Sequence, residues 1–131
     1  MSEENVEVVR RILEAWKTGD LAAEIPFDPH VMFVVSRDYP EFGVFVGPDG
    51  VREYMRRFLA QWEEWAVEAD GMEATGDTVL VRATQRGTFR SSGISSEMPG
   101  FFVFTFRAGR IIRLDTIMNE SDAREAAGLS E

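Results

Sequence analysis

Strand-like segments separated by tight turns fill the second half of the sequence, and this pattern limits the fold more than any other feature. Between residues 78 and 90, apolar residues alternate with arginine and threonine. Successive side chains of a strand point to opposite faces, so one face of this segment is apolar and the other is polar. Glycine-containing turns at 76–77 and 108–109 are typical of hairpins between antiparallel strands. The predicted strands span residues 65–75, with a bulge at Gly71, 78–90, 101–107 and 110–119.

The first part of the sequence carries the spacing of helices instead. Apolar residues recur at this spacing from Val6 to Trp16, and Ser2 is placed to cap the start of that helix. Gly19 predicts its end, in the left-handed conformation that glycine adopts readily. A short second helix is expected from Leu21, and Pro26 stops it.

Two strands and a third helix are predicted between these two regions. Residues 31–35 are apolar on both faces, which is typical of a strand that is covered on both sides. After a turn, residues 42–46 return as a second strand. Pro48 then opens a helix whose apolar face runs from Val51 to Trp62.

The order of these elements indicates the fold class. A last short helix, capped by Ser121 and ended by Gly128, follows the strands. Helices come first and mostly antiparallel strands follow, which favours an α+β protein over an alternating α/β fold. A length of 131 residues suits one domain that spans residues 1–131.

Short motifs in a characteristic order run through nearly the whole sequence. They are Gly19-Asp20-Leu21, Asp28-Pro29-His30-Val31, Gly47-Pro48-Asp49-Gly50-Val51-Arg52-Glu53-Tyr54, Gly76-Asp77, Gly109-Arg110-Ile111-Ile112-Arg113-Leu114 and Arg124-Glu125-Ala126-Ala127-Gly128-Leu129. In their order and spacing the chain resembles the nuclear transport factor 2-like superfamily, and within it the SnoaL-like polyketide cyclase family. The resemblance implies a cystatin-like α+β barrel: a cone-shaped, strongly curved, mostly antiparallel sheet wrapped around N-terminal helices. It also implies a central pocket and a homodimer formed through the outer face of the sheet.

Ketosteroid isomerases are the relatives whose chemistry is best defined, and they use a tyrosine, an aspartate base and a protonated aspartate. Carried over by resemblance, these three positions hold Ile12, Val35 and Phe102. None of these side chains transfers a proton or holds an oxyanion. The sequence therefore argues against isomerase chemistry of the usual form.

Three polar residues deserve separate interpretation. Asp38 could act as a base if the hairpin places it at the mouth of the pocket, but aspartate is common in turns and a solvated carboxylate is the simpler interpretation. His30, the only histidine, is interpreted as a surface turn residue. Asp115 is expected on the outer face, in a cross-strand ion pair with Arg82 or Arg86.

Apolar and aromatic side chains at core spacing are the candidates for lining the pocket, and a purely structural role in the core explains them equally well. Gln85 and Thr116 are the polar side chains expected to point into it and to orient a ligand. The full set of candidate lining residues is Ile12, Trp16, Val35, Tyr54, Met55, Phe58, Gln85, Phe102, Leu114, Thr116 and Met118.

Composition narrows the classes of partner. A formal net charge of −9 disfavours binding to nucleic acid, and the arginines at 52, 56 and 57 are interpreted as a solvated helix face of mixed charge. No cysteine is present, and neither a phosphate-binding glycine loop nor a cluster of metal-ligand residues is found, so no cofactor and no metal are expected. The start of the sequence lacks the pattern of a signal peptide and no segment suits a membrane span, so we expect a cytoplasmic protein.

These observations support a protein that binds a small apolar or aromatic molecule in a central pocket. One alternative is a lyase, cyclase, isomerase or hydrolase acting on a polyketide-like or terpenoid-like substrate, with Asp38, His30 or Gln85 supplying the chemistry. Another is a non-catalytic interaction module whose pocket is filled by side chains. Ile111 and Ile117 are expected on the outer face of the sheet, where an apolar strip would favour a homodimer.

Overall fold

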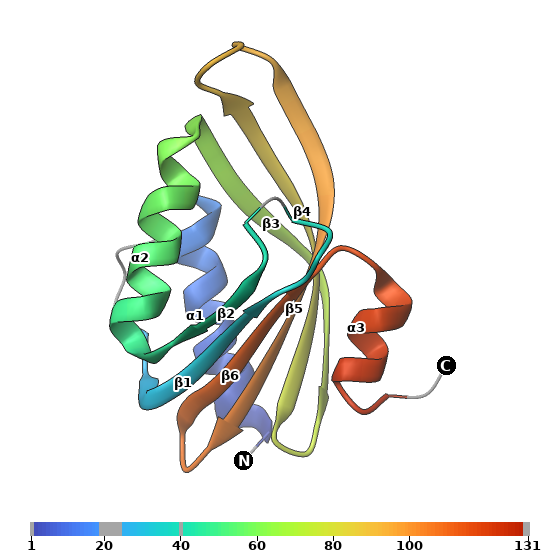
Figure 1. Ribbon diagram of the computed structural model, residues 1–131. Helices are drawn as coiled ribbons and strands as arrows, with labels where there is room; N and C mark the ends of the chain where they lie inside the picture. The colour runs from blue at the N-terminus through green and yellow to red at the C-terminus, as the bar shows by residue number, and fades with distance from the viewer. Residues whose placement is uncertain (1, 19–24, 40, 130–131) are drawn as a thin grey trace.

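A six-stranded sheet curves around two helices in the computed structural model, which describes residues 2–18, 25–39 and 41–129 (Figure 1). The elements follow the chain in the order α1 (Ser2–Lys17), β1 (Phe27–Val35), β2 (Gly43–Val46), α2 (Gly47–Ala60), β3 (Trp62–Thr75), β4 (Thr78–Phe89), β5 (Ser95–Arg107), β6 (Arg110–Ile117) and α3 (Glu120–Ala126). No helix in the described part of the chain is long and apolar enough to cross a membrane.

The strand order in the sheet is β2-β1-β6-β5-β4-β3. Every neighbouring pair is antiparallel except β1 and β6, which run parallel. Helices α1 and α2 cover the concave face, and α3 lies against the opposite face (Figure 1). The predicted α+β class with a mostly antiparallel, curved sheet is thereby confirmed.

The main core lies between the concave face and the two long helices. Helix α1 buries the stripe that its sequence predicts, including Val9, Leu13 and Trp16. Helix α2 has Pro48 in its first turn and buries Val51 and Tyr54. These helices close one side of the space in which the candidate site is found.

A smaller core lies on the outer face, where α3 packs against β5 and β6. The side chain of Asn119 accepts a hydrogen bond of 3.0 Å from the backbone N–H of Asp122 and caps α3. The prediction that Ser121 caps this helix is therefore wrong by two positions. Asn119 is an equally good capping residue, and the last strand ends early enough to leave it free for this role.

Strand β6 contains an irregularity that overturns the expected orientation of Ile111. The register between β5 and β6 shifts between Thr105, which pairs with Arg113, and Phe106, which pairs with Ile111. The extra residue, Ile112, reverses the alternation of side chains. Ile111 is therefore completely buried in the main core instead of lying on the outer face, whereas Ile117 does lie on the outer face but is covered there by α3.

Other boundaries differ from the predictions in smaller ways. The bulge in β3 is confirmed by a register shift between Ala69 and Gly71. Strand β5 begins at Ser95, six residues before the predicted start, because its polar first half continues the hairpin with β4. The predicted cap at Gly19 and the helix from Leu21 fall on residues 19–24, outside the described residues, as does the side chain of Ser2.

Candidate functional site

A small cavity lies between the concave face of the sheet and helices α1 and α2. Among the described residues, it is lined by Trp16, Phe33, Tyr39, Tyr54, Met55, Phe58, Trp65, Gln85, Phe102 and Thr116. Its volume of about 20 Å³ is room for roughly one water molecule. In this closed form the cavity is too small for an aromatic ring.

Aromatic rings in mutual contact form most of the wall. Tyr54 packs edge-on against Phe33, with ring centroids 5.0 Å apart, and stacks on Phe58 at 5.9 Å. Phe58 in turn makes an edge contact of 5.2 Å with Trp65. On the opposite side, Trp16 from α1 meets Phe102 from β5 at 5.4 Å. Flat aromatic walls of this kind favour flat apolar ligands.

Gln85 and Tyr39 form the main polar pair of the cavity. The Nε2 atom of Gln85 donates to the Tyr39 hydroxyl over 3.0 Å and to the carbonyl oxygen of Pro99 over 3.2 Å. Burial raises the pKa of Tyr39 to about 12, although the Gln85 hydrogen bond opposes the shift. Burial raises the pKa of Tyr54 as well. Both hydroxyls are therefore neutral hydrogen-bond donors at physiological pH.

Three further polar atoms of the cavity residues are buried without a hydrogen-bond partner. They are Trp16 Nε1, Trp65 Nε1 and Thr116 Oγ1. A buried donor that makes no hydrogen bond costs about 1–3 kcal/mol, and native structures contain few of them. All three atoms belong to residues that line the cavity, so a ligand or water with acceptor atoms that reached them would satisfy them.

The backbone of β5 is shaped to admit the Gln85 side chain. A Cβ atom at Gly100 would lie 2.8 Å from Gln85 Nε2 and 3.0 Å from two of its side-chain carbons. Glycine at this position thus makes room for the amide that holds Tyr39.

The structure brings seven of the eleven predicted lining residues around the cavity: Trp16, Tyr54, Met55, Phe58, Gln85, Phe102 and Thr116. The other four do not line it. Ile12, Val35 and Leu114 are buried in the surrounding core, and Met118 is half-buried against that core. Ile12 lies one helical turn before Trp16, which places it beside the cavity and not at its wall.

Three lining residues were missed by the sequence analysis. Phe33 shares a face with Val31 and Val35 of β1, a signal that strand alternation does contain. Trp65 likewise shares a face with buried Val67. Tyr39 lies in the turn after β1, and no periodic pattern predicts where a turn residue points.

Neither Asp38 nor His30 reaches the cavity lining. Asp38 is exposed in the turn, where its carboxylate accepts a hydrogen bond of 3.4 Å from Ser36. The His30 side chain is 93% exposed, with Asp28 as its neighbour at 3.9 Å. Asp38 therefore matches the surface-turn interpretation, whereas His30 is exposed as predicted but lies within β1 and not in a turn. Among the described lining residues no carboxylate or imidazole is present.

Asp115 makes a different ion pair from the predicted one. Its carboxylate receives two hydrogen bonds, of 2.9 and 3.0 Å, from the guanidinium of Arg113 on the same strand. Arg82 pairs instead with Glu120 on α3, and Arg86 pairs with glutamates of β3 and β5. The expected partners were wrong because residues two apart on one face of β6 lie close enough for arginine to fold back.

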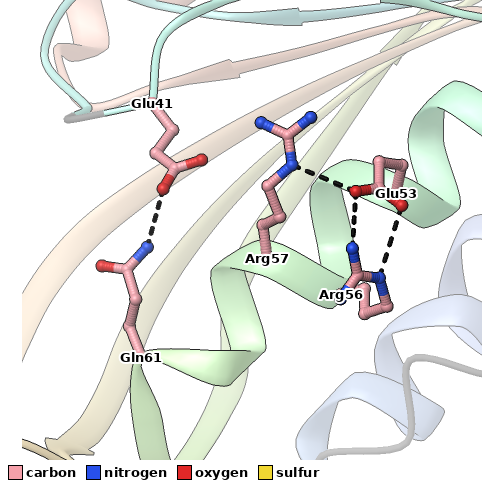
Figure 2. Close-up of polar contacts among 5 residues, drawn as sticks. All are labelled: Glu41, Glu53, Arg56, Arg57 and Gln61. Atoms are coloured by element: carbon pink, nitrogen blue, oxygen red, sulfur yellow. Dashed lines mark hydrogen bonds and ion pairs between the residues drawn. The ribbon is translucent and has the colours of Figure 1, made fainter.

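The arginines of α2 form the mixed-charge face that the sequence predicts. Glu53 receives hydrogen bonds from both Arg56 and Arg57 (Figure 2). At the end of the helix, Gln61 donates to Glu41 over 3.1 Å, which ties the end of α2 to the loop between β1 and β2 (Figure 2). In the part of the chain that the structure describes, no three acidic or histidine side chains gather as a metal site would need.

A curved α+β sheet closed by two helices around an aromatic cavity defines a class of small pocket proteins, and comparisons with known proteins place the chain within it. The SnoaL-like domain matches residues 9–114, and the chain belongs to this family. No curated protein matches the sequence.

Solved structures show the same fold. A nuclear transport factor 2-like protein of unknown function from Burkholderia pseudomallei K96243 is 22% identical, with 93% of this chain and 95% of that chain covered and a TM-score of 0.77. A protein classed as a SnoaL-like polyketide cyclase, from Jannaschia sp. CCS1, is 18% identical over 99% and 95%, with a TM-score of 0.76. TerC, co-crystallised with polyporic acid, is 18% identical over 95% and 98%, with a TM-score of 0.74. At these identities the similarity establishes the nuclear transport factor 2-like fold.

Proposed function

We propose that the protein binds a flat aromatic molecule that carries acceptor oxygens, such as carbonyl groups, in the central cavity. The observation that carries this proposal is the set of unpartnered buried polar atoms, Trp16 Nε1, Trp65 Nε1 and Thr116 Oγ1. The rings around them suit a flat ligand, and the polar atoms suit oxygens at its edge. The similarity to TerC, which was crystallised with polyporic acid, agrees with a small-molecule site in this fold.

Binding requires the cavity to expand from its closed volume. The cost of moving side chains is offset by the burial of the ligand ring, worth about 1.5–3 kcal/mol, and by hydrogen bonds worth about 1 kcal/mol each. An apolar ligand without acceptor atoms would leave the indole N–H groups of Trp16 and Trp65 and the hydroxyl of Thr116 without hydrogen bonds. The proposal therefore predicts discrimination between ligands of equal shape by their oxygens alone.

A matched pair of probes tests this expectation. Coumarin and naphthalene are fused two-ring molecules of similar size, but only coumarin carries a carbonyl and a ring oxygen. Calorimetric titration should give coumarin an affinity about tenfold higher or more, as one to two hydrogen bonds would supply. Thr116→Val, which keeps the shape and removes the hydroxyl, should reduce that preference. Equal affinities, or no binding of either probe, would reject the proposal.

Catalysis is the second candidate, and Tyr39 is the observation that favours it. Its hydroxyl accepts from Gln85, so its own proton can be donated to a ligand oxygen. A cyclase, lyase, isomerase or hydrolase acting on a polyketide-like or terpenoid-like molecule would use this proton as an acid. Tyr39→Phe, assayed against such substrates, should then abolish turnover and leave binding nearly unchanged.

The filled-pocket alternative has its support in the small volume of the cavity. A non-catalytic interaction module would keep the cavity closed to every probe. The failure of both coumarin and naphthalene to bind would favour this alternative.

A homodimer through the outer face of the sheet is part of the proposal. Met32 pairs with Val46, and Val34 pairs with Val44, so these four side chains share the outer face of β1 and β2. Three of them are exposed apolar residues, at 38% for Met32, 55% for Val44 and 62% for Val46. This outer strip replaces the pair Ile111 and Ile117 as the basis for the dimer, and a second copy of the chain would cover it.

A further inference from the structure

A large open groove lies next to the central cavity, at the end of the sheet where the β4–β5 hairpin extends beyond the helices (Figure 1). Its volume is about 850 Å³, which is within the usual range of ligand sites. Among the described residues it is lined by Lys17, Thr18, Leu59, Trp62, Glu63, Glu64, Trp65, Ala66, Arg86, Gly87, Thr88, Ser95, Ser96 and Glu97. We refer to it as the outer groove.

Trp65 belongs to the lining of both the cavity and the outer groove. Its indole is half-buried and its Nε1 atom has no hydrogen-bond partner, so no polar contact fixes it in the closed position. Trp65 borders both the cavity, with a volume of about 20 Å³, and the outer groove, with a volume of about 850 Å³. The indole therefore has room to rotate toward the groove, and this rotation would enlarge the cavity.

Tyr39 and Trp62, by contrast, are held by additional contacts. Tyr39 is fixed by the hydrogen bond from Gln85, and the loop that follows it is tied to α2 by Gln61 and Glu41 (Figure 2). The neighbouring tryptophan of the groove, Trp62, is only 4% exposed and stacks on Phe89 at 4.2 Å. Trp65 has an apolar edge contact with Phe58 and the space of the outer groove beside it.

The position opposite Trp65 on the neighbouring strand is a glycine. Trp65 pairs with Gly87 of β4, and Gly87 pairs with Ser96 of β5, so these three residues share the concave face. Glycine contributes no side chain there. The ring of Trp62 occupies that space instead, where a Cβ atom of Gly87 would overlap its carbons. Trp62, Trp65 and Ser96 therefore line this part of the outer groove together and form its floor.

The groups around this floor are hydrophilic and largely balanced in charge. Thr18, Thr88, Ser95 and Ser96 supply hydroxyls, which both donate and accept hydrogen bonds. In the described lining, the charged residues are two cations, Lys17 and Arg86, and three anions, Glu63, Glu64 and Glu97. Arg86 is already paired with Glu68 and Glu97, each at 2.6 Å, so this balance disfavours an anionic ligand. A neutral group that carries several hydroxyls matches this surface best.

We propose that the outer groove and the central cavity are two parts of one binding site, separated by Trp65. The aromatic ring of the ligand enters the cavity as Trp65 swings outward, and a neutral polyhydroxylated substituent on that ring, such as a glycosyl group, occupies the groove. This inference rests on the proposed function, because it needs an aromatic ring in the cavity, but it assigns a second compartment and a ligand class to it.

Umbelliferone and its glucoside skimmin test the two parts separately. Both carry the same aromatic ring, and only skimmin carries a sugar. The wild type should bind skimmin at least as tightly as umbelliferone, since the groove accepts the sugar. Ser96→Phe, which places a ring on the groove floor, should lower the affinity for skimmin about tenfold more than that for umbelliferone. Ser91→Phe, at the exposed end of the same hairpin, should leave the ratio of affinities unchanged.

Stopped-flow association measures the role of Trp65. Trp65→Phe leaves a smaller wall and should raise the association rate of both probes at least about threefold. If umbelliferone binds and skimmin binds more than about tenfold weaker, the groove is no part of the site, and the inference fails while the proposed function stands. If neither probe binds, both fail. If Trp65→Phe leaves the association rates unchanged, Trp65 does not control the entry of the ligand ring into the cavity.

Discussion

The Nε2 atom of Gln85 donates a 3.0 Å hydrogen bond to the hydroxyl of Tyr39, across 46 positions of sequence. It joins the middle of β4 to the turn that follows β1, and it positions the Tyr39 hydroxyl at the wall of the cavity. Burial of this pair disfavours the charged phenolate, so ionisation of Tyr39 would destabilise the folded protein even though Gln85 could still donate to it. Tyr39 therefore couples the candidate site to the stability of the fold.

The first prediction concerns the pH dependence of stability. The pKa of Tyr39 is about 12 in the folded protein because of burial, against about 10 in the unfolded chain. The stabilisation is therefore complete below pH 10 and is lost as the pH rises toward 12, on the order of 2 kcal/mol in all. Urea unfolding of the wild type and of Tyr39→Phe, measured from pH 8 to pH 12, should show the difference in unfolding free energy narrowing over that interval. Tyr54 is present in both proteins and cancels, so a constant difference would contradict the assignment.

The second prediction concerns two glycines of the β3–β4 pair. A Cβ atom at Gly87 would overlap ring carbons of Trp62 and lie 2.9 Å from the carbonyl oxygen of Glu64, whereas one at Gly71 meets only the end of the Arg82 side chain at 3.3 Å. Gly87→Ala should cost about 1–3 kcal/mol of unfolding free energy, because a buried ring and a backbone must move. Gly71→Ala, the matched control, should change stability by less than about 0.5 kcal/mol.

Thermal or urea unfolding of Gly87→Ala and Gly71→Ala measures this difference in stability. The shift in Trp62 should also appear as altered tryptophan fluorescence in Gly87→Ala. Similar stabilities for the two variants would mean that Trp62 does not lie against Gly87 as described.

The third prediction concerns the turn between β5 and β6. Ala108 has a φ of +52° and Gly109 a φ of +79°. A non-glycine residue in the left-handed region is strained by roughly 1–2 kcal/mol, but asparagine tolerates it and Asn-Gly is the preferred pair in such turns. Ala108→Asn should therefore raise the unfolding free energy by about 0.5–1 kcal/mol, whereas Ala108→Val should lower it. A lower urea midpoint for Ala108→Asn would refute this account of the turn.

Much of the fold follows from local patterns that the sequence displays. The alternation in β4 predicts that Val79, Val81 and Ala83 face inward, and all three are buried. The same alternation places Gln85 inward, so one half of the polar pair in the cavity was predictable. Tyr54 and Phe58 of α2 were predictable from helical spacing, whereas Trp62, which was predicted on the same helix, is the first residue of β3.

The remainder depends on contacts between distant segments. The side chain of Tyr39 reaches the cavity only because the turn after β1 folds over it, and no periodicity extends into a turn. A single inserted residue, Ile112, reverses the faces of β6 and buries Ile111. Asp115 forms its ion pair with Arg113 of the same strand and not with the cross-strand arginines. The partner in an ion pair depends on side-chain conformations, which the spacing of residues does not determine.

The fourth prediction concerns assembly through the outer strip of β1 and β2. Met32, Val44 and Val46 are exposed apolar residues on one face of two paired strands. Burying them against a second copy removes apolar surface from water at about 25 cal/mol per Å². Sedimentation equilibrium at micromolar concentration should give twice the protomer mass of 14.8 kDa. Val44→Glu would bring a carboxylate into the interface and should shift the protein to monomer.

Ile94 provides the matched control for this experiment. Like Val44, it is an exposed aliphatic residue, with 62% of its surface accessible. It lies in the loop between β4 and β5, away from the outer strip. Ile94→Glu adds the same charge and should leave the dimer intact. Circular dichroism should show native secondary structure in both variants, since neither residue is buried in the protomer. A wild type that sediments only as monomer, or dissociation by Ile94→Glu and Val44→Glu alike, would exclude the outer strip as the specific interface.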